Sequence, residues 1–449
     1  MREGSDSDLA GAPDAGAPVR VGVLSFHNSK ETKAIVNAVH ALGHEPVWLG
    51  EENTRSSIEA ARLQFDPAVD VVVNRLLTTK AAHPLEDLGI ATSYAATHPV
   101  LNPATVVVRT MHKYGAAATL TAAGIPVPDA YLAFTTRTIN EGNHLTAEKA
   151  VHKSVIGTNG ARMKLIDGDD TVSPYVAGRR AFIQEFIDTK TARPFDVRAY
   201  VVGGTLIGAM KRFAPSDEWR TNVSIGGAVA DFTADLPEEA ANLSLAAADV
   251  LDLDYAGVDL LCRDDTWYVL EVNATAGFKG FFEATGISPA PSIAALAIER
   301  GGGNVTPERV RSLATELDDS VPECKPSLDP EPTEPETVGY TKRVTVSGGD
   351  QSIDVIAKSD TGAERTSIDF DVAAAIGAGP ILDTVRIRSG SQAGRKKRPL
   401  VEIQLQIGNR WQTVTASVEN RSHMDYPVLR GRDVLEGYTV DVTKREREE

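Results

Sequence analysis

The stretch Thr266–Asn273 reads T-W-Y-V-L-E-V-N and ends in two side chains that carry oxygen, Glu271 and Asn273. Its apolar residues are typical of a buried strand, and alternation along a strand places Glu271 and Asn273 on the same face. The preceding stretch, Ala256–Cys262, also reads as a strand, and a hairpin would bring its Asp259 beside them. Each residue alone is more often an ordinary polar residue at a strand end. Together they form a set of oxygen ligands of the kind that Mg²⁺ prefers alongside substrate phosphates.

Length, charge and cysteine content limit the classes of protein. At 449 residues the chain is long enough for two or three domains, and its formal net charge of -16 argues against direct binding to nucleic acid or to an anionic membrane. No apolar run is long enough to span a bilayer, and residues 1–18 are expected to be a disordered tail and not a signal peptide. Cys262 and Cys324 are the only cysteines, which favours the reducing cytoplasm over a disulfide framework.

The N-terminal part has the pattern of a small open α/β unit, predicted over residues 19–99. An apolar strand is followed by a helical pattern that stops at Gly43, and further apolar runs supply the other strands. A long helix is expected after Asn102, with Pro103 in its first turn and its end at Gly124. The predicted elements before that helix are strands Val19–Phe26, Pro46–Leu49 and Val69–Leu77 and helix Glu31–Leu42.

The remainder divides where the composition changes. Residues 100–301 show short strands with glycine-bearing turns and one helix, Pro237–Leu251, which indicates an α+β body. Residues 302–337 contain G-G-G-N, a short helix near Pro307 and D-P-E-P-T-E-P-E, and we predict a linker there. From 338 to 445 nearly every segment alternates or is β-branched, which predicts a small all-β barrel or sandwich.

Several candidate ligands for a nucleotide precede the acidic strands. Lys113 lies on the long helix, and Lys153 precedes a turn with Gly157 and Gly160, where glycine lets backbone amides approach phosphate closely. Alone, such lysines and turns are usually solvent-exposed, and no Walker-type loop is present. The candidates that follow are Glu185, Phe186 and Ile187 in an apolar stretch, Asp196 and Arg198 in one strand, and Lys211, Arg212, Trp219, Arg220, Thr221 and Asn222.

The order of these motifs resembles the ATP-grasp superfamily and, within it, the RimK-like amino-acid ligases. The resemblance runs from Arg109 to about Gly301 and implies a two-lobed ATP-grasp body behind the N-terminal α/β unit. Ile156 stands where such enzymes usually carry an acid, and T-A-G-F-K-G at 275–280 replaces the commoner S-P-G-L-E-G. The matching motifs are K-S-V-I-G-T-N-G (153–160), Q-E-F-I (184–187), F-D-V-R (195–198), K-R-F (211–213), W-R-T-N (219–222), A-G-V-D (256–259) and E-V-N-A-T-A-G-F (271–278).

The resemblance also implies a role for each matching residue. Magnesium or manganese would be held by Asp259, Glu271 and Asn273. The phosphates of ATP would meet Lys113 and Lys153 at the Gly157–Gly160 turn, Arg212 would steady the transferred phosphoryl group, and the acyl substrate would contact Arg220 and Asn222. The adenine would lie along Glu185, Phe186 and Ile187, with Asp196 near the ribose.

Such a site supports phosphoryl transfer to a carboxylate, followed by attack of an amine on the acyl phosphate. In RimK-like relatives the amine is commonly glutamate, and the acceptor is a protein C-terminus, a peptide or a coenzyme carboxylate. The sequence does not choose among these acceptors. The alternative from another class is a nucleotide-binding adaptor with a degenerate ATP-grasp module and a non-catalytic β domain.

The C-terminal domain carries D-T-G-A at 360–363 after a predicted strand. Asp360 could form half of a carboxylate dyad, which would need a second copy of the domain and hence a homodimer. The tripeptide alone more often marks an aspartate that caps a tight turn. The segments 395–408 and 420–435 resemble a retropepsin-like family often described as ATP-dependent zinc proteases, although Glu364 is an extra residue. No H-E-x-x-H is present and His423 is the only histidine after residue 152, so no zinc is expected. The domain would hydrolyse or bind the product.

Overall fold

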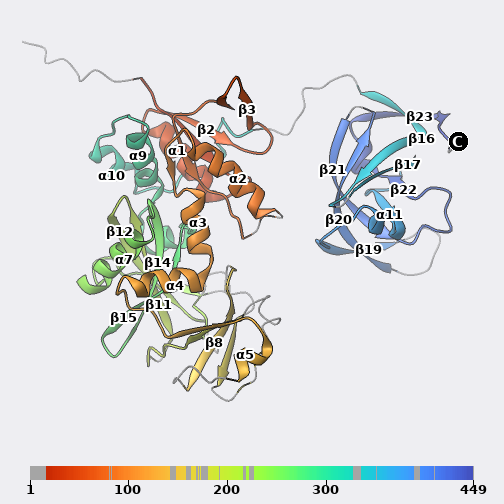
Figure 1. Cartoon of the computed structure of the whole chain (residues 1–449). Coiled ribbons are helices and arrows are strands. Elements are labelled where there is room, and N and C mark those ends of the chain that lie inside the picture. Colours follow the sequence, from red (N-terminus) through yellow and green to blue (C-terminus); the bar gives the residue numbers. More distant parts are fainter. Residues whose placement is uncertain are drawn as a thin grey trace, which may run out of the picture. The chain divides into compact units, whose positions relative to one another are not determined.

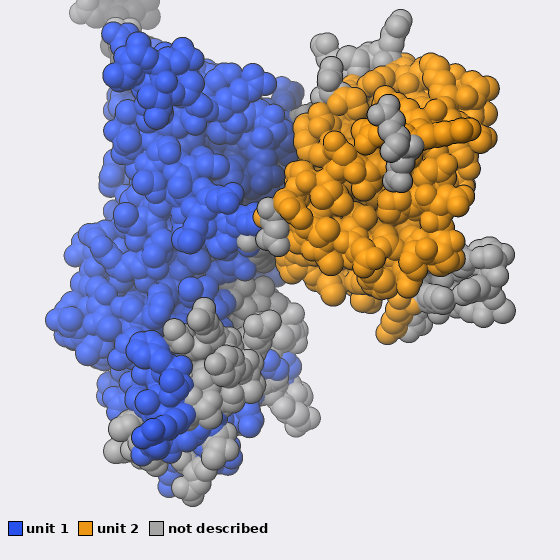
Figure 2. Space-filling model, turned by 45° about the vertical axis from the view of Figure 1, so that its right-hand side comes forward, with its two compact units in different colours: residues 1–328 blue, residues 329–449 orange. Residues whose placement is uncertain are grey.

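The computed structural model describes residues 17–79, 81, 83–141, 148–157, 163–167, 170, 172, 181–191, 193–215, 219–221, 227–326, 335–349, 351–388, 395–408 and 410–447 (Figure 1). The chain divides into two compact units, residues 1–328 and 329–449, which Figure 2 distinguishes by colour. The predicted tail at 1–18 and the acidic, proline-rich stretch at 329–336 lie mostly outside the described residues.

The N-terminal part of unit 1 is a parallel sheet in the order β2-β1-β5-β6, as its continuous apolar runs predict. Helix α1 ends before Gly43, whose φ of 86° only glycine adopts readily. Helix α9 packs against α1 and shares its core (Figure 1). The elements are β1 (Arg20–Leu24), α1 (Lys30–Ala41), β2 (Glu45–Leu49), the hairpin β3 (Arg55–Glu59) and β4 (Arg62–Asp66), β5 (Val71–Asn74), α2 (Pro84–Ala95), β6 (Val100–Leu101) and α9 (Ala290–Arg300).

Two antiparallel sheets build the rest of unit 1. One has the order β7-β10-β8-β9 and the other β13-β12-β11-β14-β15, with α7 packed against strands of the second. The elements are β7 (Ala130–Ala133), α5 (Thr136–Asn140), β8 (Lys149–Ser154), β9 (Lys164–Asp167), β10 (Ala181–Glu185), β11 (Phe195–Val202), β12 (Thr205–Phe213), β13 (Ala228–Asp231), α7 (Glu238–Val250), β14 (Tyr255–Arg263), β15 (Thr266–Asn273) and α8 (Lys279–Thr285).

Asn102 joins the parallel sheet to the second antiparallel sheet. It is fully buried with a φ of 54°, and its side-chain NH₂ donates to the carbonyls of Tyr255 and Ala274, each at 2.8 Å. Its side-chain oxygen accepts from the backbone N–H of Asp254 at 2.9 Å. A buried amide satisfied on both sides fixes the register between the two parts.

The single helix predicted from Asn102 to Gly124 is wrong, because the structure has two helices, α3 (Ala104–Met111) and α4 (Lys113–Ala122). His112 between them is extended, and its Nδ1 accepts from the backbone N–H of Gly115 at 3.0 Å. The N–H of Lys113 donates to the carbonyl of Val155 at 2.9 Å. A side-chain cap therefore starts a new helix at Lys113, in contact with the segment after β8.

Much of the predicted linker at 302–337 instead packs on the N-terminal sheet. It includes α10 (Pro307–Leu313), and its apolar residues Leu317 and Cys324 join the core of α1 and β1. Gly303 lies in close contact with that sheet, since an added Cβ would meet a Val19 methyl at 2.7 Å. Glycine at this position therefore serves close packing and not flexibility.

Unit 2 contains a closed barrel in which β16, β20, β21, β18, β22 and β17 pair in a ring. The alternating residues of these strands supply its core, as the sequence predicts. The elements are β16 (Glu336–Ser347), β17 (Ser352–Ser359), β18 (Ser367–Asp369), α11 (Phe370–Ala375), β19 (Asp383–Arg388), β20 (Arg395–Ile407), β21 (Arg410–Glu419), β22 (Val428–Arg430), α12 (Arg432–Leu435) and β23 (Tyr438–Arg445).

No single helix in the described part of the chain is long and apolar enough to cross a bilayer. The bent pair α8 and α9, whose axes differ by 118°, passes the length and composition criteria together. Ile293, Ala294 and Ile298 of α9 are fully buried in the core of unit 1.

Candidate active site

A cavity of about 470 Å³ lies in unit 1 and is lined by both antiparallel sheets. Strands β8 and β10 contribute Lys153 and Gln184. Strands β11, β12, β14 and β15 contribute a group of acidic and cationic residues: Asp196, Arg198, Arg212, Asp259 and Glu271. The first residue of α4 and a few residues of the N-terminal unit complete the lining. The cavity thus brings together segments from most of the length of unit 1.

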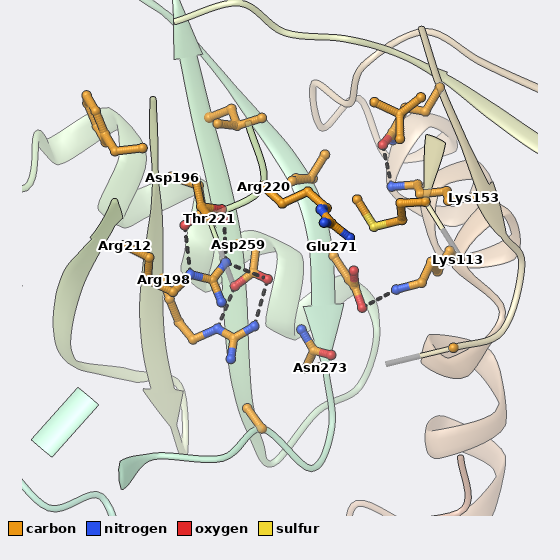
Figure 3. Close-up of a pocket in the computed structure, with 18 of the residues that line it drawn as sticks. Lys113, Lys153, Asp196, Arg198, Arg212, Arg220, Thr221, Asp259, Glu271 and Asn273 are labelled. Carbon is orange, nitrogen blue, oxygen red and sulfur yellow. Dashed lines mark hydrogen bonds and ion pairs between the residues drawn. The ribbon is translucent and has the colours of Figure 1, made fainter. Parts of the chain in front are cut away.

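Asp259 lies at the centre of a buried charge cluster on the second sheet (Figure 3). Arg198 holds both of its oxygens, with Nε to Oδ1 at 2.6 Å and Nη2 to Oδ2 at 2.7 Å, and Arg212 Nη2 approaches Oδ2 at 3.0 Å. Burial opposes ionisation, but the two arginines outweigh it and lower the pKa of Asp259 to about 2. Asp259 is therefore charged at every physiological pH.

Asp196 belongs to the same cluster. Arg212 donates to both of its oxygens at 2.7 and 2.5 Å, and the hydroxyl of Thr221 donates to Oδ2 at 2.7 Å. Arg212 is itself buried, and its two carboxylate partners raise its pKa although desolvation opposes this. In the structure its carboxylate holds Arg212 in place, and the expected position of Asp196 near the ribose of ATP stays a prediction.

Glu271 faces Asp259 across the β14–β15 hairpin, as the predicted hairpin requires, and Asn273 faces Gly257. Lys113 forms an ion pair with Glu271. With its amide oriented to satisfy both neighbours, Asn273 donates to Glu271 Oε1 at 3.2 Å and accepts from Arg198 Nη2 at 3.3 Å. The three expected metal ligands therefore converge, with cations already held against their carboxylates.

The donor set fits a hard divalent cation. Asp259 and Glu271 supply carboxylate oxygens and Asn273 supplies an amide oxygen, all hard ligands suited to Mg²⁺ or Mn²⁺. In the structure Lys113, Arg198 and Arg212 form ion pairs with these carboxylates.

Lys153 approaches the cavity from the opposite sheet (Figure 3). Only 5% of the residue is exposed, and its Nζ donates to Gln184 Oε1 at 2.6 Å. Burial and the nearby Lys113 lower the pKa of Lys153 to about 7, against the opposing effects of Glu271 and Asp259. Its charge therefore depends on what occupies the cavity.

The apolar stretch after β10 lines the same cavity. The N–H groups of Glu185 and Phe186 donate to the carbonyls of Asp129 and Lys149, whereas that of Ile187 makes no hydrogen bond to another described residue. The ring of Phe186 packs edge-on against Trp219 with centroids 5.8 Å apart. The Glu185 carboxylate pairs with Arg263 at 2.5 Å.

Two further predicted residues, Gly157 and Arg220, lie in loops that line the cavity. Arg220 extends into the space between the Asp259 cluster and the lysines (Figure 3). Gly160 and Asn222 lie outside the described residues. Of the two residues predicted to contact the acyl substrate, the structure therefore places only Arg220.

Sequence patterns assign no role to several residues that the cavity brings together. Arg198 is the main partner of Asp259, and its spacing of two from Asp196 on one strand was a signal for their shared face. Gln184 and Arg75 also line the cavity. Gln184 begins the Q-E-F-I motif, whereas no local pattern marks Arg75, because its surroundings come from distant segments.

Asp360 of unit 2 has a different environment. It follows β17, is partly exposed, and accepts a hydrogen bond from the N–H of Gly362 at 3.0 Å through Oδ1. Nearby, the N–H and hydroxyl of Thr366 donate to Asp433 at 2.8 to 3.0 Å. The loop is well anchored, and a second acid for a dyad is not among the described partners of Asp360.

Comparison with known proteins assigns both units. The RimK-like ATP-grasp domain model matches residues 110–297, and the model of the retropepsin-like aspartic endopeptidase RimB matches residues 372–449, a range that begins after Asp360. A tetrahydromethanopterin:alpha-L-glutamate ligase of Methanocaldococcus jannaschii is 31% identical over 43% of this chain and 68% of its own length. A probable alpha-L-glutamate ligase of Hahella chejuensis is 29% identical over 60% and 91%.

Solved structures share the fold of unit 1. The ATP-grasp ligase PsnB, solved with a phosphomimetic variant of its minimal precursor, Mg and ADP, has a TM-score of 0.51 at 19% identity, covering 63% of this chain and 98% of that chain. PsnB with a precursor peptide and AMPPNP gives a TM-score of 0.50 at 19% identity, covering 65% and all of that chain. The chain belongs to the RimK-like ATP-grasp family of ATP-dependent ligases and carries a C-terminal domain of the retropepsin-like RimB family.

Proposed function

We propose that unit 1 uses ATP and Mg²⁺ to join L-glutamate to a carboxylate acceptor through an acyl phosphate. The observation that carries the proposal is one cavity in which Asp259, Glu271 and Asn273 converge with four buried or half-buried cations. The alpha-L-glutamate ligase names of the relatives support glutamate as the amine. A protein C-terminus, a peptide and a coenzyme carboxylate are all candidate acceptors.

The role of each residue that lines the cavity follows from its position. Lys113 and Lys153 supply positive charge for the phosphates, and the backbone at Ile187 supplies a donor for the adenine edge. Arg212, fixed by its two aspartates, presents rigid charge to the transferring phosphoryl group. A divalent ion held by the Asp259–Glu271–Asn273 set would offset the charge that develops on the phosphates.

The chemistry requires activation of the carboxylate and no protein nucleophile. A carboxylate oxygen of the acceptor attacks the γ-phosphorus of ATP, and ADP leaves. The glutamate amine then attacks the acyl carbon, loses a proton and expels phosphate, which forms the amide bond. In this scheme Arg220 and Asn222 contact the acyl substrate, and Asp196 acts by orienting Arg212.

The test is intact-mass spectrometry of candidate acceptors after incubation with the full chain, ATP, Mg²⁺ and glutamate, with ADP release followed in parallel. Stepwise additions of glutamyl mass coupled to ADP would support the proposal. ADP formed with other amines but not with glutamate would refute the choice of donor. If no ADP formed with any acceptor, the nucleotide-binding adaptor would become the better explanation.

For unit 2 we propose a role in hydrolysing or binding the ligated product, with two copies of Asp360 forming the dyad in a homodimer. The family of its C-terminal part supports this proposal. Incubating the glutamylated product with the full chain, without ATP, tests it. Loss of glutamyl mass would indicate hydrolysis, and retention of the product on the immobilised protein would indicate binding. If the product were neither hydrolysed nor retained, the proposal would be refuted.

A further inference from the structure

Arg75 is a buried arginine in the cavity lining to which neither the sequence nor the site described above assigns a role. It follows β5 of the N-terminal sheet and is 2% exposed. Its Nε and Nη1 atoms are buried and donate no hydrogen bond to any described residue. The described ion pairs include none for Arg75, and its guanidinium lies 5.9 Å from the centre of the Tyr255 ring.

Such an arrangement is costly unless an anion completes it. Burying a guanidinium without a carboxylate partner loses hydration that a contact with an aromatic ring repays only in small part. The other arginines of the cluster, Arg198 and Arg212, are each paired with a carboxylate through two hydrogen bonds. Arg75 differs from them within the same cavity because no described carboxylate pairs with it.

We propose that Arg75 binds a carboxylate of the amino acid whose amine forms the new amide bond. This contact would lie at the end of the cavity that residues of the N-terminal unit line. The inference rests on the proposed ligase function and names the group that recognises its donor. Leu77 and Thr79 line the cavity from the same segment, and Glu31 and Gly277 line it as well. The N-terminal unit thus contributes directly to the substrate site.

The donor fits this position better than the acceptor does. A residue that is almost wholly buried reaches only a group enclosed by the cavity, and a free amino acid can be enclosed. A peptide or protein tail must continue to solvent. A dicarboxylic amino acid keeps two carboxylates after its amine has reacted, and a guanidinium binds a carboxylate through paired hydrogen bonds.

The test measures L-glutamate binding to the full chain by titration calorimetry, with a non-hydrolysable ATP analogue and Mg²⁺ present. Arg75→Met should weaken binding at least about tenfold, the size expected for losing hydrogen bonds to a charged group. Arg75→Lys should recover part of the affinity. Arg55→Met, which alters an exposed arginine of β3, is the matched control and should bind as the wild type does.

Thermal stability separates a binding role from a structural one. Because Arg75 lacks a charged partner in the described structure, Arg75→Met should melt at or above the wild-type temperature, and glutamate should raise the melting temperature of the wild type alone. A clear fall in melting temperature with unchanged glutamate affinity would overturn the inference and show that Arg75 only supports the fold.

Other outcomes are equally decisive. Wild-type protein that binds no carboxylate-bearing amino acid overturns the inference, even if ADP release with another amine still supports a ligase. An Arg75→Met variant whose KM rises for the acceptor, with glutamate affinity intact, overturns it in favour of an acceptor contact. Absence of ADP with every acceptor would refute the proposed function, while calorimetry would still decide the role of Arg75.

Discussion

The acids of the two units are held in contrasting ways. In unit 1, Asp196 and Asp259 are 4% and 5% exposed, and arginines contact both oxygens of each. In unit 2, Asp360 is partly exposed and its described side-chain contact is with the amide of the turn it begins. In the first arrangement the arginines offset the cost of burying the carboxylates, whereas Asp360 stays in partial contact with solvent.

The two units therefore differ in how strongly the structure supports a catalytic site in each. The charge cluster of unit 1 lies within one compact unit and has its counter-charges in place. A catalytic dyad at Asp360 would need a second acid, and the D-T-G tripeptide is satisfied as a turn without one. The proposed ligase site therefore uses groups of one unit, whereas the proposed peptidase dyad would need an acid from a second copy of the chain.

Asp259→Ala against Asp360→Ala tests this comparison directly, and we expect the larger loss of stability in unit 1. Removing Asp259 leaves Arg198 and Arg212 short of counter-charge, which should cost about 3–5 kcal/mol. Asp360→Ala should cost less than about 1 kcal/mol, because its loss affects one turn. Amide hydrogen exchange in urea reports each unit separately. Equal losses would show that the contrast in burial has no energetic consequence.

Glu271→Gln keeps the shape of the side chain and removes the charge that pairs with Lys113. ADP release should fall at least about 100-fold, and saturation should need more Mg²⁺, because a hard ligand and the anchor of a phosphate-binding lysine are both weakened. Steady-state rates at several Mg²⁺ concentrations measure this. Glu45→Gln, which alters an exposed ion pair with Arg20, is the control and should stay within about twofold. Full activity of Glu271→Gln would contradict the metal hypothesis.

What the sequence predicted well was local. Alternation put Glu271 and Asn273 on one face, and the short turn put Asp259 opposite Glu271, as the strand register confirms. The barrel of unit 2 followed from the same alternation. These features depend on residues close in the chain, which is where periodicity carries information.

What the sequence missed depends on distant contacts. The break at His112 arises because its ring caps the next helix and Lys113 bonds to Val155, far along the chain. Gly303 reads as a linker residue until Val19 is known to lie against it. The lack of a carboxylate beside Arg75 is likewise visible only when the segments around it are placed.

The pH dependence of nucleotide binding should identify Lys153. Burial and the nearby Lys113 lower its pKa to about 7 from the ordinary value of 10.5, so its charge is present below pH 7 and lost above. Bound phosphate favours the charged form, so ADP affinity should fall as pH rises above 7, by up to about tenfold per unit, with proton uptake on binding. Calorimetry in buffers of different ionisation enthalpy measures both quantities.

Two variants at Lys153 complete that experiment. A guanidinium at this position would stay charged, so Lys153→Arg should bind ADP with little dependence on pH, and Lys153→Met should bind weakly at every pH. The unfolded chain holds the Lys153 proton up to the ordinary pKa, whereas the folded chain loses it above about 7. Because the unfolded state then binds more protons, the folded state should gain stability relative to Lys153→Met as pH rises from about 7 to about 10. The opposite slope would show that Lys153 stays charged in the folded protein.

Asp360→Asn should have the smallest effect on the ligase and the largest on any hydrolysis. The residues that line the cavity all belong to unit 1, so ADP release should remain within about twofold of wild type. If two copies of unit 2 form the dyad, loss of the carboxylate should abolish removal of glutamate from the product, since an amide cannot share the proton. Sedimentation analysis should then find a dimer for both proteins, because the substitution removes the acid and not the contact surface. Hydrolysis that survives Asp360→Asn, or a wild-type monomer that hydrolyses, would assign the activity to other residues.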